Sequence, residues 1–167
     1  MPALAVDIGS QTIKYLVGNT KVPPELSQAM ALINTAGVVA PVDAASKEKY
    51  KEIFATIFKD STVPKNDVRL CLPESLVSTK IVEMPLLSDA ELASAVGWQA
   101  ERNIPIPPDQ LSLQYQVLFR PAKKEDGQMR VLLIGVRKQL VEEIVIVLND
   151  MGIEQGLIET TMLDLIR

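Results

Sequence analysis

The sequence predicts an α/β protein in which a strand-rich part is interrupted by a small α+β segment. Three observations support this class. Two short apolar runs joined by Gly9, Ser10 and Gln11 open the chain, an amphipathic helical face covers 46–59, and a helix-strand-strand-helix pattern covers 86–151. The 167 residues, 47% of them hydrophobic, match one globular domain of ordinary size.

Composition excludes several classes of function. With 17 Lys+Arg against 21 Asp+Glu, the net charge of -4 gives no basic field to attract nucleic-acid phosphates, so no nucleic-acid partner is expected. The absence of His excludes Ser-His-Asp, Cys-His and zinc HExxH sites. A single cysteine, Cys71, cannot form an internal disulfide, and its neighbours Leu70 and Leu72 predict a buried thiol. Asp7 lies where a signal peptide needs apolar residues, and the apolar runs are too short to span a membrane, so we expect a cytoplasmic chain.

The elements of the first half follow from local pattern. Residues 4–8 and 12–17 predict a β-hairpin, and 29–33 a third strand. Apolar residues at positions 50, 53, 54, 57 and 58 share one face of a helix over 46–59. Residues 67–72 and 77–84 predict two further strands, the second closed by Pro85.

The second half opens with a capping box, Ser88 with Glu91, which predicts a helix reaching Asn103. Alternation over 111–119 predicts a strand whose odd positions are buried, followed by a strand over 129–136. A helix over 138–151 ends at Gly152, a short strand lies near 157–158, and 160–167 resembles the first turns of a helix. Because that pattern stops without a cap, we expect the chain to be part of a longer protein.

The first hairpin carries the residues that suggest phosphate chemistry. Asp7 ends a strand, Gly9 permits close backbone approach, and the segment up to Lys14 offers N–H and hydroxyl donors through Ser10, Gln11 and Thr12. A carboxylate of this kind holds Mg²⁺ through water. A plain hairpin turn with a solvated Asp7 explains the same residues equally well. We assign no catalytic residue and no metal-ligating residue.

Residues 5–14 (AVDIGSQTIK) resemble the first phosphate loop of the actin and sugar-kinase superfamily. The chain is also similar to the PilM family of type IV pilus assembly proteins, which resemble the division protein FtsA. The similarity lies in residues 84–85 and 91–92 and above all in residues 96–107 (VGWQAERNIPIP). The likeness continues through 131–138 to Gly152 and Glu159 and covers essentially the whole chain.

The resemblance implies an actin-like, ribonuclease H-like subdomain over 1–84, completed by 153–167, with an inserted subdomain over 85–152. It implies nucleotide and Mg²⁺ contacts for Asp7, Gly9, Ser10, Gln11, Thr12 and Lys14. Family members are about twice as long, and their second half supplies the other phosphate loop and the adenine pocket. ATP and Mg²⁺ are therefore expected only with the full-length protein, and we expect weak or no ATP binding here.

The resemblance also implies a partner, because the PilM family binds the N-terminal tail of the inner-membrane protein PilN in a groove between its two N-terminal subdomains and contacts the assembly ATPase. The strand over 77–84 lies at the predicted junction, where an extended peptide can pair with its edge. We therefore expect the groove to use Val77, Thr79, Ile81 and Glu83, together with Trp98 and Glu101. A buried contact between subdomains explains Trp98 equally well.

These observations favour a cytoplasmic scaffold at the inner membrane, attached there only through partner proteins. An ATP-dependent, sugar-kinase-like enzyme and an FtsA-like division protein of the same superfamily are the alternatives. Without the second half of the protein, the apolar face that would contact that half is exposed, so this piece can also dimerise.

Overall fold

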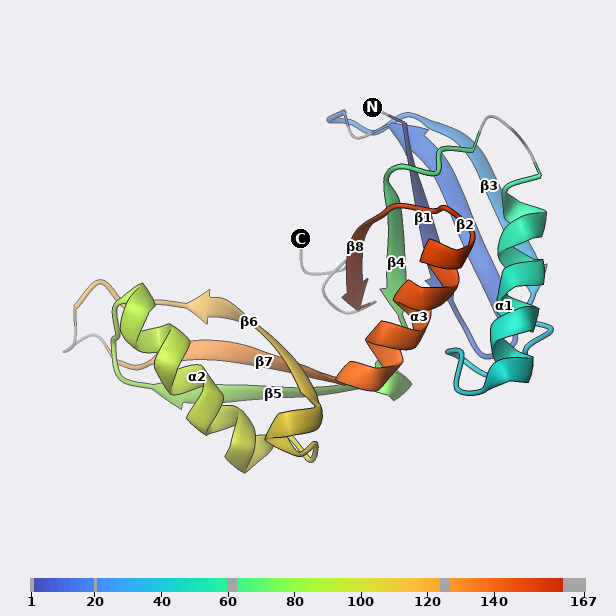
Figure 1. The fold of residues 1–167 in the computed structure, drawn as a ribbon. Helices are drawn as coiled ribbons and strands as arrows, with labels where there is room; N and C mark the ends of the chain where they lie inside the picture. Colours follow the sequence, from blue (N-terminus) through green and yellow to red (C-terminus); the bar gives the residue numbers. More distant parts are fainter. Residues whose placement is uncertain (1, 20, 60–62, 124–126, 161–167) are drawn as a thin grey trace. The chain divides into compact units, whose positions relative to one another are not determined.

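The computed structural model describes residues 2–19, 21–59, 63–123 and 127–160 and confirms the α/β class (Figure 1). The chain divides into two compact units. One contains residues 1–74 and 140–167, and the other contains residues 75–139. We refer to them as the large unit and the small unit.

The large unit contains a mixed five-stranded sheet with the order β3-β2-β1-β4-β8. Its first three strands form an antiparallel meander, while β4 runs parallel to β1 and β8 parallel to β4. This arrangement confirms the predicted hairpin, the third strand and the strand near 157–158. The strands are β1 (Pro2–Ile8), β2 (Thr12–Asn19), β3 (Leu26–Ile33), β4 (Val68–Leu72) and β8 (Gln155–Thr160).

Helices α1 (Ala44–Ile57) and α3 (Lys138–Asp150) cover one face of this sheet (Figure 1). The sheet buries every second side chain of β1 and β2 toward them, since strand side chains alternate between faces. The apolar stripe predicted for α1 is confirmed, except that Phe58 is only half-buried. The residues buried on the two helices include Tyr50, Ile53, Phe54, Ile57, Ile144, Val147 and Leu148.

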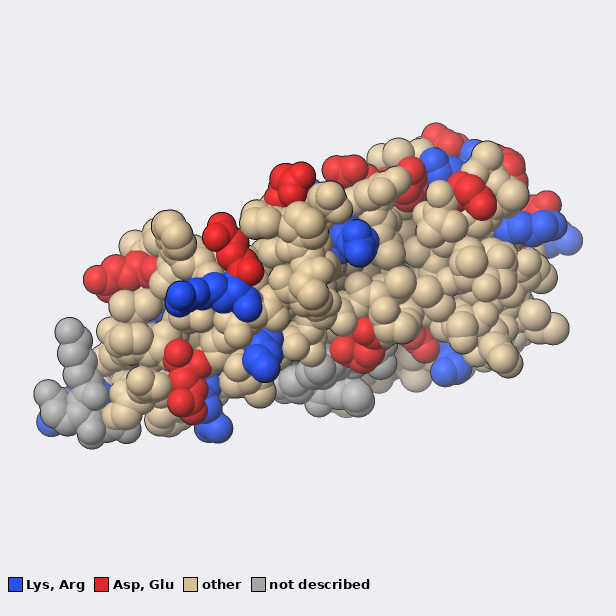
Figure 2. Space-filling model, turned by 90° about the horizontal axis from the view of Figure 1, so that it is seen from below, with Lys and Arg blue, Asp and Glu red and all other residues tan. Residues whose placement is uncertain are grey.

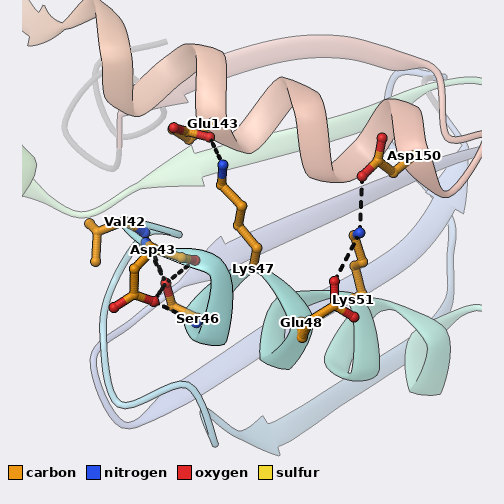
Figure 3. Close-up of polar contacts among 8 residues, drawn as sticks. All are labelled: Val42, Asp43, Ser46, Lys47, Glu48, Lys51, Glu143 and Asp150. Carbon is orange, nitrogen blue, oxygen red and sulfur yellow. Dashed lines mark hydrogen bonds and ion pairs between the residues drawn. The ribbon is translucent and has the colours of Figure 1, made fainter.

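Ion pairs join α1 to α3 (Figure 3). Lys47 pairs with Glu143, and Lys51 contacts Asp150 at 2.9 Å and Glu48 on its own helix at 3.1 Å. The hydrogen bond to Asp150 raises the pKa of Lys51. Because Lys47 and Glu143 are the less exposed of the two inter-helix pairs, we expect them to contribute more to stability.

The small unit is a three-stranded antiparallel sheet, order β5-β7-β6, with one helix on one face. The capping box of Ser88 and Glu91 is confirmed, with the Ser88 N–H donating to the Glu91 carboxylate at 2.8 Å. One short 3₁₀ turn, over Glu74–Leu76, precedes β5, and another, over Pro108–Gln110, precedes β6. The elements are β5 (Val77–Met84), α2 (Asp89–Asn103), β6 (Leu111–Phe119) and β7 (Met129–Arg137).

The division between the units differs from the predicted boundaries at 84 and 152. Strand β5 pairs along its whole length with β7, and therefore belongs to the small sheet rather than to the sheet of β4. Helix α3 belongs from Leu140 onward to the large unit, where it contacts α1. The small unit thus has one strand more and one helix fewer than the predicted helix-strand-strand-helix order.

Three predicted burials are wrong, two of them for reasons of strand geometry. Cys71 is partly exposed, because alternation along β4 directs Leu70 and Leu72 toward the helices and Cys71 toward the other face. In β6, Tyr115 and Phe119 are 40% and 43% exposed. A bulge between Val117 and Phe119 changes the alternation there, so Phe119 faces Arg130.

No helix among the described residues is long and apolar enough to cross a membrane. The helix predicted over 160–167 lies outside the described residues apart from Thr160, which ends β8.

Candidate functional site

The predicted phosphate loop is the turn between β1 and β2. The Gly9 N–H donates to the Thr12 carbonyl oxygen at 3.0 Å. A Cβ on Gly9 would lie 2.7 Å from that oxygen, so the turn itself requires glycine. Ser10 and Gln11 are exposed at its tip.

Asn34, which sequence reasoning missed, holds this turn in place. It is 6% exposed, and its amide nitrogen donates to the carbonyl oxygens of Gly9 and Val38, both at 2.8 Å. Its side-chain oxygen accepts from the Ala36 N–H at 3.1 Å, and its own N–H donates to the Gln11 oxygen at 2.8 Å. The sequence signal that could have indicated this role is a single Asn directly after the apolar run of β3.

Tyr50 connects the same loop to α1. Its hydroxyl donates to the Val38 carbonyl oxygen at 2.8 Å. Burial raises the pKa of Tyr50 to about 12, although a hydrogen bond with Asn34 opposes the shift. A continuous set of partly buried hydrogen bonds therefore runs from α1 through Val38 and Asn34 to the Gly9 turn.

Asp7 and Lys14 lie opposite each other on β1 and β2, with the Lys14 ammonium 3.5 Å from the Asp7 carboxylate. Their side chains are 39% and 64% exposed, respectively. The structure thus brings together two of the predicted nucleotide residues. Because the cation neutralises the carboxylate, however, a Mg²⁺ ion would have to compete with Lys14 for Asp7.

A cavity of about 530 Å³ lies beside this pair, on the sheet face that α1 and α3 leave uncovered. The charged residues that line the cavity have opposite charges nearby. Arg69, for example, donates to both carboxylate oxygens of Asp67, at 3.1 and 3.2 Å. These hydrogen bonds raise the pKa of Arg69. The rest of the lining is mostly apolar. The lining residues are Ala5, Val6, Asp7, Lys14, Leu16, Arg69, Leu70, Cys71 and Glu159.

These residues fit only part of a nucleotide site. Gly9, Ser10, Gln11 and Thr12 do not line the cavity, so the loop donors and the hollow surface meet only around Asp7 and Lys14. Over the described residues, no group of three or more Cys, Asp and Glu side chains is placed to hold a metal ion. The carboxylates that line the cavity are those of Asp7 and Glu159, and Mg²⁺ binding by Asp7 stays a prediction.

The predicted partner groove divides between two faces of the small unit. Val82 and Met84 pack under α2. Val77, Thr79, Ile81 and Glu83 alternate with these residues and lie on the opposite sheet face. The first three lie opposite apolar β7 residues, Ile81 opposite Leu132 for example, and Glu83 lies opposite Arg130. Ile81 is 54% exposed, and β5 is an edge strand.

Trp98 and Glu101 lie elsewhere. The side of α2 that faces the sheet carries Leu92, Val96 and Ala100, whereas Trp98 is 74% exposed and Glu101 is also exposed. The structure therefore does not bring the six predicted groove residues together. The ring of Trp98 does not pack against the sheet of its own unit, and its burial between subdomains stays a prediction.

Figure 2 shows Lys and Arg interspersed with Asp and Glu on the face that it displays. This mixture of charges resembles an ordinary solvated surface and offers no basic patch there for nucleic acid.

Comparison with known proteins places this fold. The family model described as "Type IV pilus assembly protein PilM" matches residues 5–164. No curated protein sequence matches the chain significantly. Among solved structures, a chain of the "PilM-PilN type IV pilus biogenesis complex" is similar with a TM-score of 0.79 and 21% identity, over 95% of this chain and 47% of that one.

A second similar structure is the cytoplasmic domain of EpsL, an inner-membrane component of the type II secretion system of Vibrio cholerae, with a TM-score of 0.62 and 16% identity. It is covered over 57% of its length, and this chain over 96%. The chain thus spans about half the length of these structures. The fold is an actin-like α/β fold with a small antiparallel sheet, and the chain belongs to the PilM family of type IV pilus assembly proteins.

Proposed function

We propose that this chain is a non-enzymatic scaffold of type IV pilus assembly that binds the cytoplasmic N-terminal tail of PilN. In this role it links PilN at the inner membrane to the pilus assembly ATPase. The family match over residues 5–164 carries the proposal. Likeness to the chain solved in a PilM–PilN complex supports it.

Strand β5 is the element best suited to hold an extended tail. It is an edge strand with an exposed Ile81, and it lies beside an apolar row of β7. A peptide that adds to such an edge gains main-chain hydrogen bonds, while its side chains contact the sheet face. Val77, Thr79, Ile81 and Glu83 are therefore the proposed contact residues, and Trp98 and Glu101 are outside this contact.

Calorimetric titration with a synthetic PilN tail tests this proposal. We expect saturable binding that Ile81→Lys weakens at least about tenfold and Trp98→Ala leaves unchanged, because only Ile81 lies on the proposed face. Circular dichroism of each variant checks that it is folded. Absence of tail binding would refute the scaffold function, and full binding by the Ile81 variant would refute the β5 site.

The alternative of an ATP-dependent enzyme depends on the cavity beside Asp7. Titration of the chain with Mg-ATP separates the two functions. We expect no measurable binding, since the loop donors and the cavity do not form one enclosed site and ligand pockets bury most of their ligand. Micromolar binding that Asp7→Asn abolishes would favour the kinase-like alternative.

A further inference from the structure

Strand β3 is an edge of the large sheet, and no other described strand pairs with its outer side (Figure 1). Its eight residues, LSQAMALI, contain no charge and no proline. Leu26, Met30 and Ile33 are 62%, 50% and 76% exposed. Soluble proteins usually protect edge strands with charges, prolines or covering segments, because an open edge is a template for pairing. An unprotected apolar edge of this length therefore indicates a strand partner.

The hydrogen-bonding pattern shows which backbone groups are available. The Asn34 N–H donates to the Gln11 carbonyl oxygen, so Asn34 and Gln11 form a hydrogen-bonded pair. The adjacent pair of Ile33 and Thr12 is therefore a non-hydrogen-bonded one. Hydrogen-bonded and non-hydrogen-bonded pairs alternate along an antiparallel ladder. Positions 28, 30 and 32 therefore direct their backbone groups to β2, and Ala29, Ala31 and Ile33 direct theirs outward. Among the described residues, no backbone bond reaches these outward groups.

We propose that β3 pairs antiparallel with β3 of a second copy of this chain, about a two-fold axis at Met30. In this register Ala29 lies opposite Ala31 of the other copy, so the outward groups of both are satisfied reciprocally. Met30 faces Met30 in the central non-hydrogen-bonded pair, where side chains approach most closely. The two sheets would then form one continuous sheet.

The charge distribution favours a second copy over a charged partner segment. Self-pairing places no like charges opposite each other, because the strand carries none, and the flanking Glu25 would meet the neutral Thr35. A two-fold interface must match itself, and small Ala29 against small Ala31 on one face, with Gln28 against Leu32 on the other, meets that condition. The inference is independent of PilN binding, which uses the small unit.

Sedimentation velocity over about two decades of concentration tests the dimer, since mass action makes dimerisation concentration-dependent. We expect the wild-type chain to dimerise, and Met30→Lys to weaken the dimer at least about tenfold by placing two ammonium groups opposite each other. Val22→Lys, at a position 98% exposed outside β3, is the matched control and should leave the dimer intact. A monomer at every concentration, or a dimer that survives Met30→Lys through another surface such as the β6 edge, overturns the proposal.

Cysteine crosslinking tests the register in a Cys71→Ala background. Met30→Cys should form an intermolecular disulfide under mild oxidation, because the paired positions face each other. Gln28→Cys should not, since the two copies of that position are about 13 Å apart in this register. Crosslinking at position 28 but not at position 30 overturns the pairing. Amide exchange gives a second readout: dimerisation should slow exchange at Ala29 and Ala31 and leave Met30, already bonded to β2, unchanged.

Discussion

Replacing Asn34 with alanine should destabilise the large unit strongly. The change removes three side-chain hydrogen bonds, two donated at 2.8 Å and one accepted at 3.1 Å. At about 1 kcal/mol for each hydrogen bond, the free energy of unfolding should fall by about 3 kcal/mol. The large value comes from burial, because water cannot replace the lost partners.

Asn19 provides a matched control. Its side chain also makes three hydrogen bonds, with Glu25 and with the backbone of Lys21 and Glu25, but these lie in a solvent-exposed loop. Asn19→Ala should therefore cost less than about 1 kcal/mol, since water replaces the partners. Urea denaturation followed by far-UV circular dichroism, at equal protein concentration, measures both. Equal losses for Asn19→Ala and Asn34→Ala, or a loss below about 1 kcal/mol for Asn34→Ala, would refute the reasoning.

Three further predictions concern the same unit and α2. Burial raises the pKa of Tyr50 to about 12, so the phenol loses its proton at lower pH in the unfolded state than in the folded state. The free energy of unfolding should therefore fall by about 2–3 kcal/mol between about pH 10 and pH 12. Thermal melts at different pH values should show a smaller decline for Tyr50→Phe. Gly9→Ala should destabilise the protein by about 1–3 kcal/mol, because the new methyl group clashes with a carbonyl oxygen. Gly97→Ala should stabilise it by about 0.5–1 kcal/mol, because the new methyl group meets open space and alanine favours a helix interior. Thermal melts measure both changes. Glu143→Gln should cost more stability than Asp150→Asn in urea denaturation, because the first carboxylate is the more buried, and the reverse order would contradict the importance given to burial.

Local pattern was enough to predict most elements. Ser88 with Glu91 located the start of α2, and Gly152, with a φ of 64°, ended α3 as expected. Such signals act within a few residues of each other, so they can be read directly from the sequence.

What the sequence could not show was the pairing of distant strands. Strand β5 follows β4 after four residues, yet it pairs with β7 some fifty positions later. Both β4 and β5 have the composition of partly buried strands, and nothing local distinguishes their sheets. The displacement of the first boundary, at 84, and the divided partner groove follow from that one assignment, because β5 carries Ile81 to the sheet face opposite α2 and Trp98.

The Gly9 turn shows why the phosphate-loop pattern carries less functional information than its residues suggest. Glycine is required there by the Thr12 oxygen, and Asn34 fixes the turn through partly buried hydrogen bonds, so this geometry needs no nucleotide. A chain that had lost ATP binding would still keep Gly9. Asp7 contributes little to the stability of the fold, because its ion pair with Lys14 is exposed to solvent. Asp7→Asn should therefore leave stability unchanged within about 0.5 kcal/mol, and any effect that it has on Mg-ATP binding by a longer chain would report on nucleotide rather than on the fold.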